Sequence, residues 1–337
     1  MKEIKNFIMN LSLWYKNSAP IFTSKESKSI LHDFFVYGKE GLTINPYNGC
    51  QHRCGYCYAT YEWSPEFYDH IYAKINATDL LCKQIQAWKE NIINPVMIAS
   101  ATDAYQPAEL KYSLTRKCVE VLQEFEIPYY VFTKSSLIER DLELHSRYSH
   151  NCFVVWSITT NNENIKRIVE PGTPPSQSVF KVIEKFSKSG IKCVVNIDPI
   201  LPLITDSNED IVNIIDSAND SGVQYVSGAI LRLRYDIWER MKYILQILNI
   251  DSSIKFYEKI FKFKDPITFK KNLNAEREYS ESIMMFLEKE VEKRNMKFGY
   301  PKLNIKKLTP PPSSSSSSSA YSLKNKKNIV SLMDFMK

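Results

Sequence analysis

The middle of the chain predicts an α/β fold built on a parallel sheet. Short β-rich runs alternate there with longer amphipathic stretches about six times, and Pro or Gly residues mark the joins. Several runs are apolar almost without interruption, such as Phe-Val-Val-Trp-Ser-Ile at 153–158, which is typical of strands buried on both faces. A barrel or partial barrel fits this pattern, and a doubly wound sheet is the alternative.

Each element follows from one of two periodicities. The β-rich runs predict strands at 42–47, 96–101, 129–133, 152–159, 191–197 and 224–227. Apolar residues three and four positions apart predict the helices between them, near 76–91, 110–126, 137–148, 175–189 and 208–221. From about residue 235 the alternation stops, and the spacing predicts helices alone, at 237–248, 253–263 and 275–294.

These patterns divide the chain into four parts. We expect an N-terminal extension (1–40), a partial (β/α)6 barrel (41–234), a C-terminal helical extension (235–308) and a disordered tail (309–337). The tail starts with three prolines and seven serines, a composition typical of a flexible linker. It ends in a short apolar segment at 329–336, for which a docking partner and a tail without function are the alternatives.

Composition excludes some classes of protein and favours others. No apolar run approaches the roughly 18 residues of a membrane span, and no signal peptide is evident, so we expect a cytoplasmic protein without a membrane partner. Seven cysteines favour reduced, metal-binding or catalytic thiols over a disulfide scaffold. Residues 235–337 hold 20 Lys and Arg against 12 Asp and Glu, an excess that suits a polyanion but equally a solvated surface.

Three cysteines form the most informative motif of the chain. Cys50, Cys54 and Cys57 are spaced C-x3-C-x2-C, directly after the first predicted strand. Structural zinc sites usually have four ligands, commonly in two pairs, and no second pair follows here. Three thiolates suit a 4Fe–4S cluster better, because one iron stays open for the amino and carboxylate groups of S-adenosylmethionine. The other cysteines (Cys82, Cys118, Cys152 and Cys193) fall singly in predicted elements and are expected in the core.

Further segments extend the motif into a family resemblance. They occur between about residues 40 and 235 and include Asn-Pro-Tyr-Asn-Gly-Cys (45–50), Thr-Asp-Ala-Tyr-Gln-Pro-Ala-Glu (102–109), Thr-Lys-Ser (133–135), Ser-Ile-Thr-Thr (157–160), Glu-Pro (170–171) and Arg-Leu-Arg (232–234). The cysteine loop resembles that of the radical S-adenosylmethionine (SAM) superfamily. The whole set resembles the spore photoproduct lyase-like proteins, also called DNA repair photolyase-like proteins.

The resemblance implies roles for polar residues at the predicted strand ends, where the chemistry of a parallel barrel gathers. Thr102 and Asp103 occupy the positions at which members of the superfamily contact the amino group of the cofactor's methionine part. Lys134 is the candidate partner for the carboxylate of the same part. Ser157 and Thr159 resemble ribose-contacting positions, and Tyr58 resembles the position that flanks the adenine.

The resemblance also implies two catalytic tyrosines. Tyr56 and Tyr58 match the tyrosines on either side of the lyase's last cluster cysteine, where a phenol can relay a hydrogen atom. The lyase carries a hydrogen-donor cysteine at the end of its second strand, and Ser100 stands at that position here. This difference predicts a related radical reaction as readily as the repair of thymine dimers.

These observations predict a radical SAM enzyme of lyase-like type. It would use a 4Fe–4S cluster to cleave S-adenosylmethionine reductively and form a 5′-deoxyadenosyl radical. We expect a nucleic acid substrate and an electron donor such as ferredoxin or flavodoxin. The alternatives are a radical SAM enzyme that acts on a protein or small molecule, and a non-catalytic iron–sulfur or zinc module that binds nucleic acid.

Overall fold

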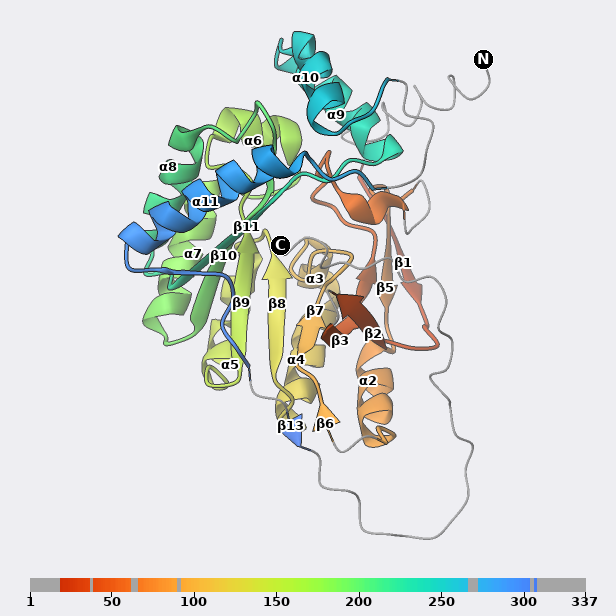
Figure 1. Cartoon of the computed structure of the whole chain (residues 1–337). Coiled ribbons are helices and arrows are strands. Elements are labelled where there is room, and N and C mark those ends of the chain that lie inside the picture. The colour runs from red at the N-terminus through yellow and green to blue at the C-terminus, as the bar shows by residue number, and fades with distance from the viewer. Residues whose placement is uncertain are drawn as a thin grey trace.

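One open sheet of eight strands forms the centre of the molecule (Figure 1). The computed structural model describes residues 19–36, 39–61, 66–89, 92–265, 272–303 and 306–307. Within them, the strand order is β12-β11-β10-β9-β8-β7-β3-β2. Neighbouring strands are parallel except β2 and β3, which pair antiparallel. Because β2 and β12 are the two edges of this order, the barrel is partial rather than closed.

The predicted strands are confirmed. The strands of the sheet are β2 (Leu31–Val36), β3 (Lys39–Ile44), β7 (Val96–Ile98), β8 (Tyr129–Thr133), β9 (Cys152–Ser157), β10 (Lys192–Ile200), β11 (Tyr225–Ile230) and β12 (Lys297–Phe298). All six strands expected from the β-rich runs are among them, in the expected sequential and parallel arrangement. The predicted α/β partial barrel is therefore confirmed, and the doubly wound alternative is not what the chain adopts.

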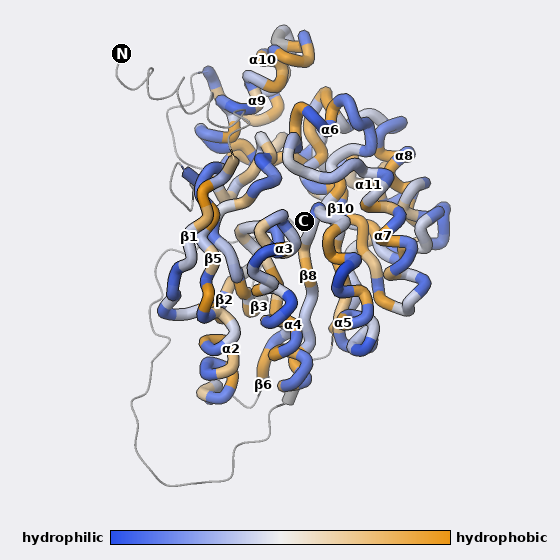
Figure 2. The backbone as a smooth tube through the Cα atoms, turned by 180° about the vertical axis from the view of Figure 1, so that it is seen from behind, coloured by the Kyte–Doolittle hydropathy of each residue, from blue (hydrophilic) through white to orange (hydrophobic). Residues whose placement is uncertain are grey.

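Helices follow most of the strands. They are α2 (Ala77–Gln86), α3 (Ala108–Tyr112), α4 (Leu114–Glu124), α5 (Leu142–Ser146), α6 (Glu163–Val169), α7 (Ser176–Lys188) and α8 (Asn208–Asp220), with the 3-10 helix η2 (Leu137–Asp141) before α5. Figure 2 shows how α7 and α8 alternate between hydrophobic and hydrophilic residues. On α7 the buried positions Val179, Ile183 and Phe186 are four and three residues apart, which gives one apolar stripe toward the strands.

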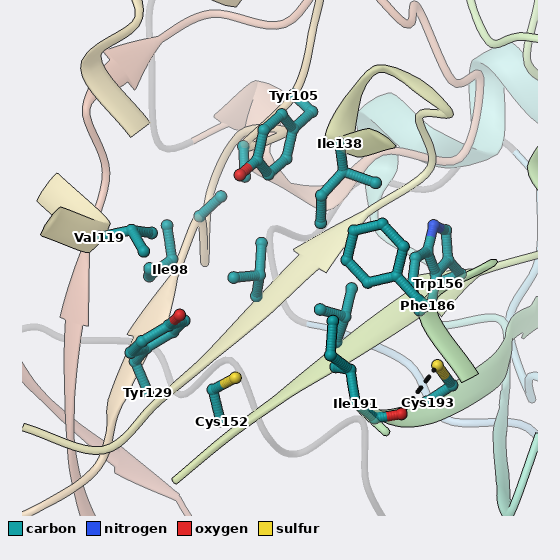
Figure 3. Close-up of a cluster of buried hydrophobic side chains, with 14 of the residues drawn as sticks. Ile98, Tyr105, Val119, Tyr129, Ile138, Cys152, Trp156, Phe186, Ile191 and Cys193 are labelled. Carbon is teal, nitrogen blue, oxygen red and sulfur yellow. Dashed lines mark hydrogen bonds between the residues drawn. The ribbon is translucent and has the colours of Figure 1, made fainter. Parts of the chain in front are cut away.

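The largest apolar core lies between these helices and the sheet. Figure 3 shows part of it, where the rings of Trp156 of β9 and Phe186 of α7 pack edge to face with their centroids 5.3 Å apart. Cys152 and Cys193 lie in the same core, and the Cys193 thiol donates to the Ile191 carbonyl at 3.3 Å. Cys118 is also buried, as predicted, whereas Cys82 is only partly buried. A small second sheet, β1 (Ile21–Lys25), β5 (His70–Lys74) and β4 (Tyr47–Asn48), lies beside the barrel.

The C-terminal region differs from the expected purely helical extension. The predicted helices are present as α9 (Tyr235–Ile247), α10 (Ile254–Ile260) and α11 (Arg277–Lys293), with η3 (Asp251–Ser253) between the first two. However, α11 is followed by β12, which adds to the sheet parallel to β11. The chain then continues to β13 (Lys306–Lys307), which pairs antiparallel with β6 (Ile92–Ile93). A strand of two residues carries no periodicity, so the sequence pattern could not reveal it.

Two expectations fall partly or wholly outside the described residues. Residues 308–337, which contain the predicted linker and docking segment, are not among those that the structure describes. The N-terminal extension is described from residue 19, apart from two residues, and supplies β1, β2 and the start of β3 to the two sheets. Among the described residues, no helix combines the length and apolar character that crossing a membrane requires.

The contact between α11 and β11 gives a test of this architecture. Leu287 is fully buried, and its side chain lies so close to Gly228 that a Cβ there would approach it to 2.6 Å. We expect Leu287→Ala to lower the free energy of unfolding by about 2–5 kcal/mol, because it leaves a cavity at this contact. Met285→Ala on the exposed face of the same helix should change it by less than about 0.5 kcal/mol. Urea unfolding followed by circular dichroism measures both, and equal effects would contradict the packing described.

Candidate active site

A cavity lies where the parallel strands reach their carboxyl ends. Its lining includes all three cysteines of the motif together with polar residues that follow or end the strands: Thr102 and Asp103 after β7, Thr133 and Lys134 at β8, Ser157 at β9, Asn196 and Asp198 on β10, and Arg232 after β11. The structure therefore brings together nearly all of the residues predicted from the sequence. The exception is Thr159, which is fully buried beside the cavity rather than on its surface.

The cysteine loop connects β4 to the 3-10 helix η1 (Tyr58–Tyr61). Cys50 and Cys54 are buried, Cys57 is partly exposed, and all three are free thiols that line the cavity. Burial raises the pKa of each thiol above its ordinary value, so the three thiolates need a positive centre to stabilise them. Gly49 sits at φ +85°, and a Cβ there would lie 2.4 Å from the His70 carbonyl, so the turn into the loop requires glycine.

The arrangement of the thiols fits a cluster better than a single ion. In the described part of the chain, no three His, Cys, Asp or Glu side chains are grouped so that they could hold one metal ion. The three thiols nevertheless face one cavity. Each cysteine of a 4Fe–4S site binds a different iron, so the sulfurs need not converge on one point. The donor set therefore fits a 4Fe–4S cluster with three protein ligands and does not favour zinc.

A buried ion cluster lies next to this loop. Lys134 Nζ is 3.0 Å from Glu170 Oε1, and Lys166 Nζ is 3.3 Å from Glu170 Oε2. Burial opposes the charge of Glu170, but the two lysines outweigh it and hold its pKa below the ordinary value. Burial likewise opposes the charge of Lys134, and the pKa of Lys134 is raised because Glu170 lies beside it. A fixed cation is thus present on the cavity wall.

The two predicted catalytic tyrosines are held by hydrogen bonds on the cavity lining. The Tyr56 hydroxyl donates to Glu170 and lies 2.8 Å from Thr159 Oγ1. The Tyr58 hydroxyl donates to the backbone carbonyl of Ser100. The side chain of Ser100 in turn accepts a hydrogen bond of 2.8 Å from Asn45. The phenols are therefore fixed in place beside the cysteines and the end of β7.

Asp103 and Thr102 are engaged by the protein itself. One Asp103 oxygen accepts from the Thr133 hydroxyl at 2.7 Å, and the other accepts from the Lys134 amide at 2.7 Å and lies 3.2 Å from His52 Nε2. Burial opposes the charge of Asp103, but His52 and these donors lower its pKa. The Thr102 hydroxyl donates to the Gly49 carbonyl at 2.6 Å. Both residues tie the cysteine loop to the strand ends, and direct contact with a cofactor stays a prediction for them.

Two residues of this site were not found from the sequence. Tyr300, just after β12, lines the cavity and packs against Phe132 with the ring centroids 6.3 Å apart. Arg240 of α9 donates to backbone carbonyls of the cysteine loop. Neither residue stands in a motif, and both come from the region beyond the predicted barrel. No local signal could have found them, since only the tertiary fold brings them to the cavity.

The structure is a partial parallel barrel that carries a three-cysteine loop at the carboxyl ends of its strands. This combination is typical of one class of iron–sulfur enzymes. A family model of the Radical SAM superfamily matches residues 44–218, and the chain belongs to that superfamily. Members of this superfamily bind S-adenosylmethionine and a 4Fe–4S cluster. The chain therefore carries the Radical SAM domain of that superfamily.

Individual relatives agree with this assignment. The chain is 30% identical over 203 residues to an uncharacterized protein of Mycobacterium tuberculosis (strain ATCC 25618 / H37Rv), covering 57% of this chain and 59% of that protein. It is 30% identical over 169 residues to an uncharacterized protein of Methanocaldococcus jannaschii, covering 48% of this chain and 61% of that protein. The aligned part thus spans less than two thirds of these relatives.

A solved structure shares the fold. A spore photoproduct lyase mutant with bound AdoMet and dinucleoside spore photoproduct superposes with a TM-score of 0.68. The match covers 87% of this chain and 84% of the lyase chain at 13% sequence identity. The TM-score shows that the two chains share a fold, and an identity of 13% adds nothing about function.

The carboxyl group of Asp198 gives a prediction about pH. Burial raises its pKa from 3.8 to about 6, although Lys134 and a 3.2 Å hydrogen bond from Asn196 oppose the shift. Between about pH 4 and pH 6 the native state therefore holds a proton that the unfolded state has lost, so the stability that this proton contributes disappears as pH rises through that window. Relative to Asp198→Asn, the wild type should lose up to about 3 kcal/mol of unfolding free energy across it. Parallel pH dependences of the two proteins in urea unfolding would contradict the assignment.

Proposed function

We propose that this protein generates a 5′-deoxyadenosyl radical in its cavity and uses it on a nucleic acid substrate, in the manner of a spore photoproduct lyase-like enzyme. The observation that carries the proposal is the set of three free thiols facing one cavity at the carboxyl ends of the strands. When bound there, a 4Fe–4S cluster and S-adenosylmethionine supply the radical by one-electron reduction of the sulfonium. The electron would come from a donor such as ferredoxin or flavodoxin.

Separate residues of the cavity would bind the cluster, the methionine part of the cofactor and the ribose. Cys50, Cys54 and Cys57 would hold three irons, and Lys134 offers its ammonium to the carboxylate of the cofactor's methionine part. Ser157 lines the cavity beside Lys134, whose Nζ donates to the Ser157 carbonyl at 3.3 Å, and this position suits a contact with the ribose. Thr159 would act indirectly, because its hydroxyl is hydrogen-bonded to Tyr56 rather than presented to the cavity.

The two tyrosines are suited to move a hydrogen atom. Tyr58 would flank the adenine, and its hydroxyl is fixed on the Ser100 carbonyl. A phenol is needed more here than in the lyase, because a serine O–H at position 100 is too strong to donate to a carbon radical. We therefore propose a radical reaction related to the repair of thymine dimers, with Tyr56 or Tyr58 as the relay.

Three observations support nucleic acid as the substrate class. The fold matches that of a lyase whose structure contains a dinucleoside photoproduct. The last third of the chain carries the basic excess of the molecule. Arg232 adds a cationic group to the cavity lining, where it could meet a phosphate.

The thiols give the direct test of the radical chemistry. We expect Cys50→Ala, Cys54→Ala and Cys57→Ala each to lose iron after anaerobic reconstitution, because a cluster with two protein ligands is poorly held. Each variant should form 5′-deoxyadenosine from S-adenosylmethionine and dithionite only at the level of a protein-free control, as measured by chromatography. Cys82→Ala, a partly buried cysteine outside the loop, is the matched control and should behave as the wild type. Cofactor cleavage by Cys50→Ala at the wild-type rate would overturn the proposal.

The substrate class has its own test. Wild-type protein should retain ultraviolet-irradiated oligonucleotides on filters at low salt, and retention should fall steeply as salt rises. The same oligonucleotides should accelerate 5′-deoxyadenosine formation over that with unirradiated DNA, RNA or a peptide mixture. Cofactor cleavage that no nucleic acid binds to or stimulates would favour a protein or small-molecule substrate. An iron–sulfur protein that binds nucleic acid but leaves the cofactor intact would favour a binding module.

A further inference from the structure

Arg240 holds the cysteine loop from the side of the C-terminal helices. It lies on α9 and is 9% exposed. Its Nε donates to the Gly55 carbonyl at 2.6 Å, and its Nη2 donates to the Cys57 carbonyl at 3.1 Å. The same Nη2 is 3.0 Å from Thr60 Oγ1. One side chain thus spans the loop from the residue after the second cysteine to the start of η1.

Among the described residues, one carboxylate pairs with this guanidinium. It belongs to Asp236, at 3.3 Å from Nη2, and the side chain of Asp236 is 30% exposed. The other oxygens of the described residues that Arg240 contacts belong to carbonyl and hydroxyl groups. Because the paired carboxylate is partly exposed to water, negative charge added close to the buried guanidinium would stabilise it further.

Apolar contacts fix the helix that carries Arg240. Trp238 and Met241, on either side of it, are fully buried in a core that also contains Cys50 and Cys54. Ile237 of the same helix lines the cavity itself. The packing of α9 therefore sets the position of Arg240. The charged group of Arg240 is held against the cysteine loop by the helix that carries it.

We propose that Arg240 is a positioning residue for the cysteine loop and that its charge stabilises the reduced state of the cluster bound there. The proposal rests on the function proposed above, since it assumes that the three thiolates hold a 4Fe–4S cluster. Reduction adds one negative charge to such a cluster, and nearby charges and hydrogen bonds set its potential. A cation held against the ligand loop favours that step, and the added negative charge compensates the guanidinium in return.

Two substitutions separate the geometric part of this role from the electrostatic part. Arg240→Gln removes the charge and the fork of donors, whereas Arg240→Lys keeps the charge but cannot reach the Gly55 and Cys57 carbonyls together. Arg277→Gln is the matched control, because Arg277 is exposed on α11 and pairs only with Glu281, one turn further along, among the described residues. Full-length proteins are reconstituted anaerobically and checked for folding by circular dichroism.

The readouts are the midpoint potential of the cluster, from a redox titration followed by electron paramagnetic resonance, and the rate of iron release to a chelator. Arg240→Gln should shift the potential to more negative values and release iron several times faster than the wild type. Arg240→Lys should release iron faster as well but restore most of the potential. Loss of all iron by folded Arg240→Gln would support the positioning role, and the lysine variant would then report on the charge.

Each contrary result has a distinct meaning. A wild-type potential and wild-type iron release in Arg240→Gln would overturn the inference while leaving the proposed function intact. A potential shifted equally in Arg240→Gln and Arg240→Lys would overturn the electrostatic part. A wild-type protein that assembles no 4Fe–4S cluster would instead refute the proposed function itself.

Discussion

The backbone of the cysteine loop is buried and irregular, so its amides and carbonyls need hydrogen-bond partners from elsewhere in the chain. The rest of the site is arranged around this constraint. The amide of Cys50 donates to the Phe67 carbonyl at 3.1 Å, and that of Gly55 donates to the Val169 carbonyl at 2.9 Å. The carbonyl of Cys54 accepts a 2.7 Å hydrogen bond from the Tyr68 hydroxyl. The loop forms no regular hydrogen-bond pattern of its own, so its backbone groups bond to parts of the chain up to 185 residues away.

The same contacts bring the charged groups to the cavity. The connection from α6 to α7 packs on the cysteine loop, where the Gly172 amide donates a hydrogen bond of 3.0 Å to the His52 carbonyl. The two backbones are so close that a Cβ on Gly172 would lie 2.1 Å from the Gln51 carbonyl. This close approach places Glu170, with its two lysines, beside the loop. Asp103 is held in turn by His52 from the loop and by the Lys134 amide from the end of β8. Loop backbone and cavity charges are therefore parts of one connected structure.

The sequence predicted what local periodicity and spacing encode. The six strands, the helices between them and the three-cysteine loop all follow from patterns within a few residues, and parallel topology then places Lys134 and Ser157 at one edge of the sheet. The direction of a particular side chain does not follow in this way. Thr159 was expected to contact the ribose, but it lies two residues beyond the end of β9, and its hydroxyl is hydrogen-bonded to Tyr56. Arg240 and Tyr300 could not be predicted at all, since their contacts depend on how α9 and β12 return to the barrel.

These two residues also change how the C-terminal region is understood. The family model ends at residue 218, yet Arg240 completes the hydrogen bonding of the cysteine loop and Tyr300 closes part of the cavity wall. Helix α9 packs into the same apolar core as Cys50 and Cys54, and without it the Gly55 and Cys57 carbonyls would lose the hydrogen bonds from Arg240. Formation of the site and docking of the C-terminal helices are therefore coupled. The region beyond the family core therefore contributes both a contact to the cysteine loop and part of the cavity lining to the candidate site.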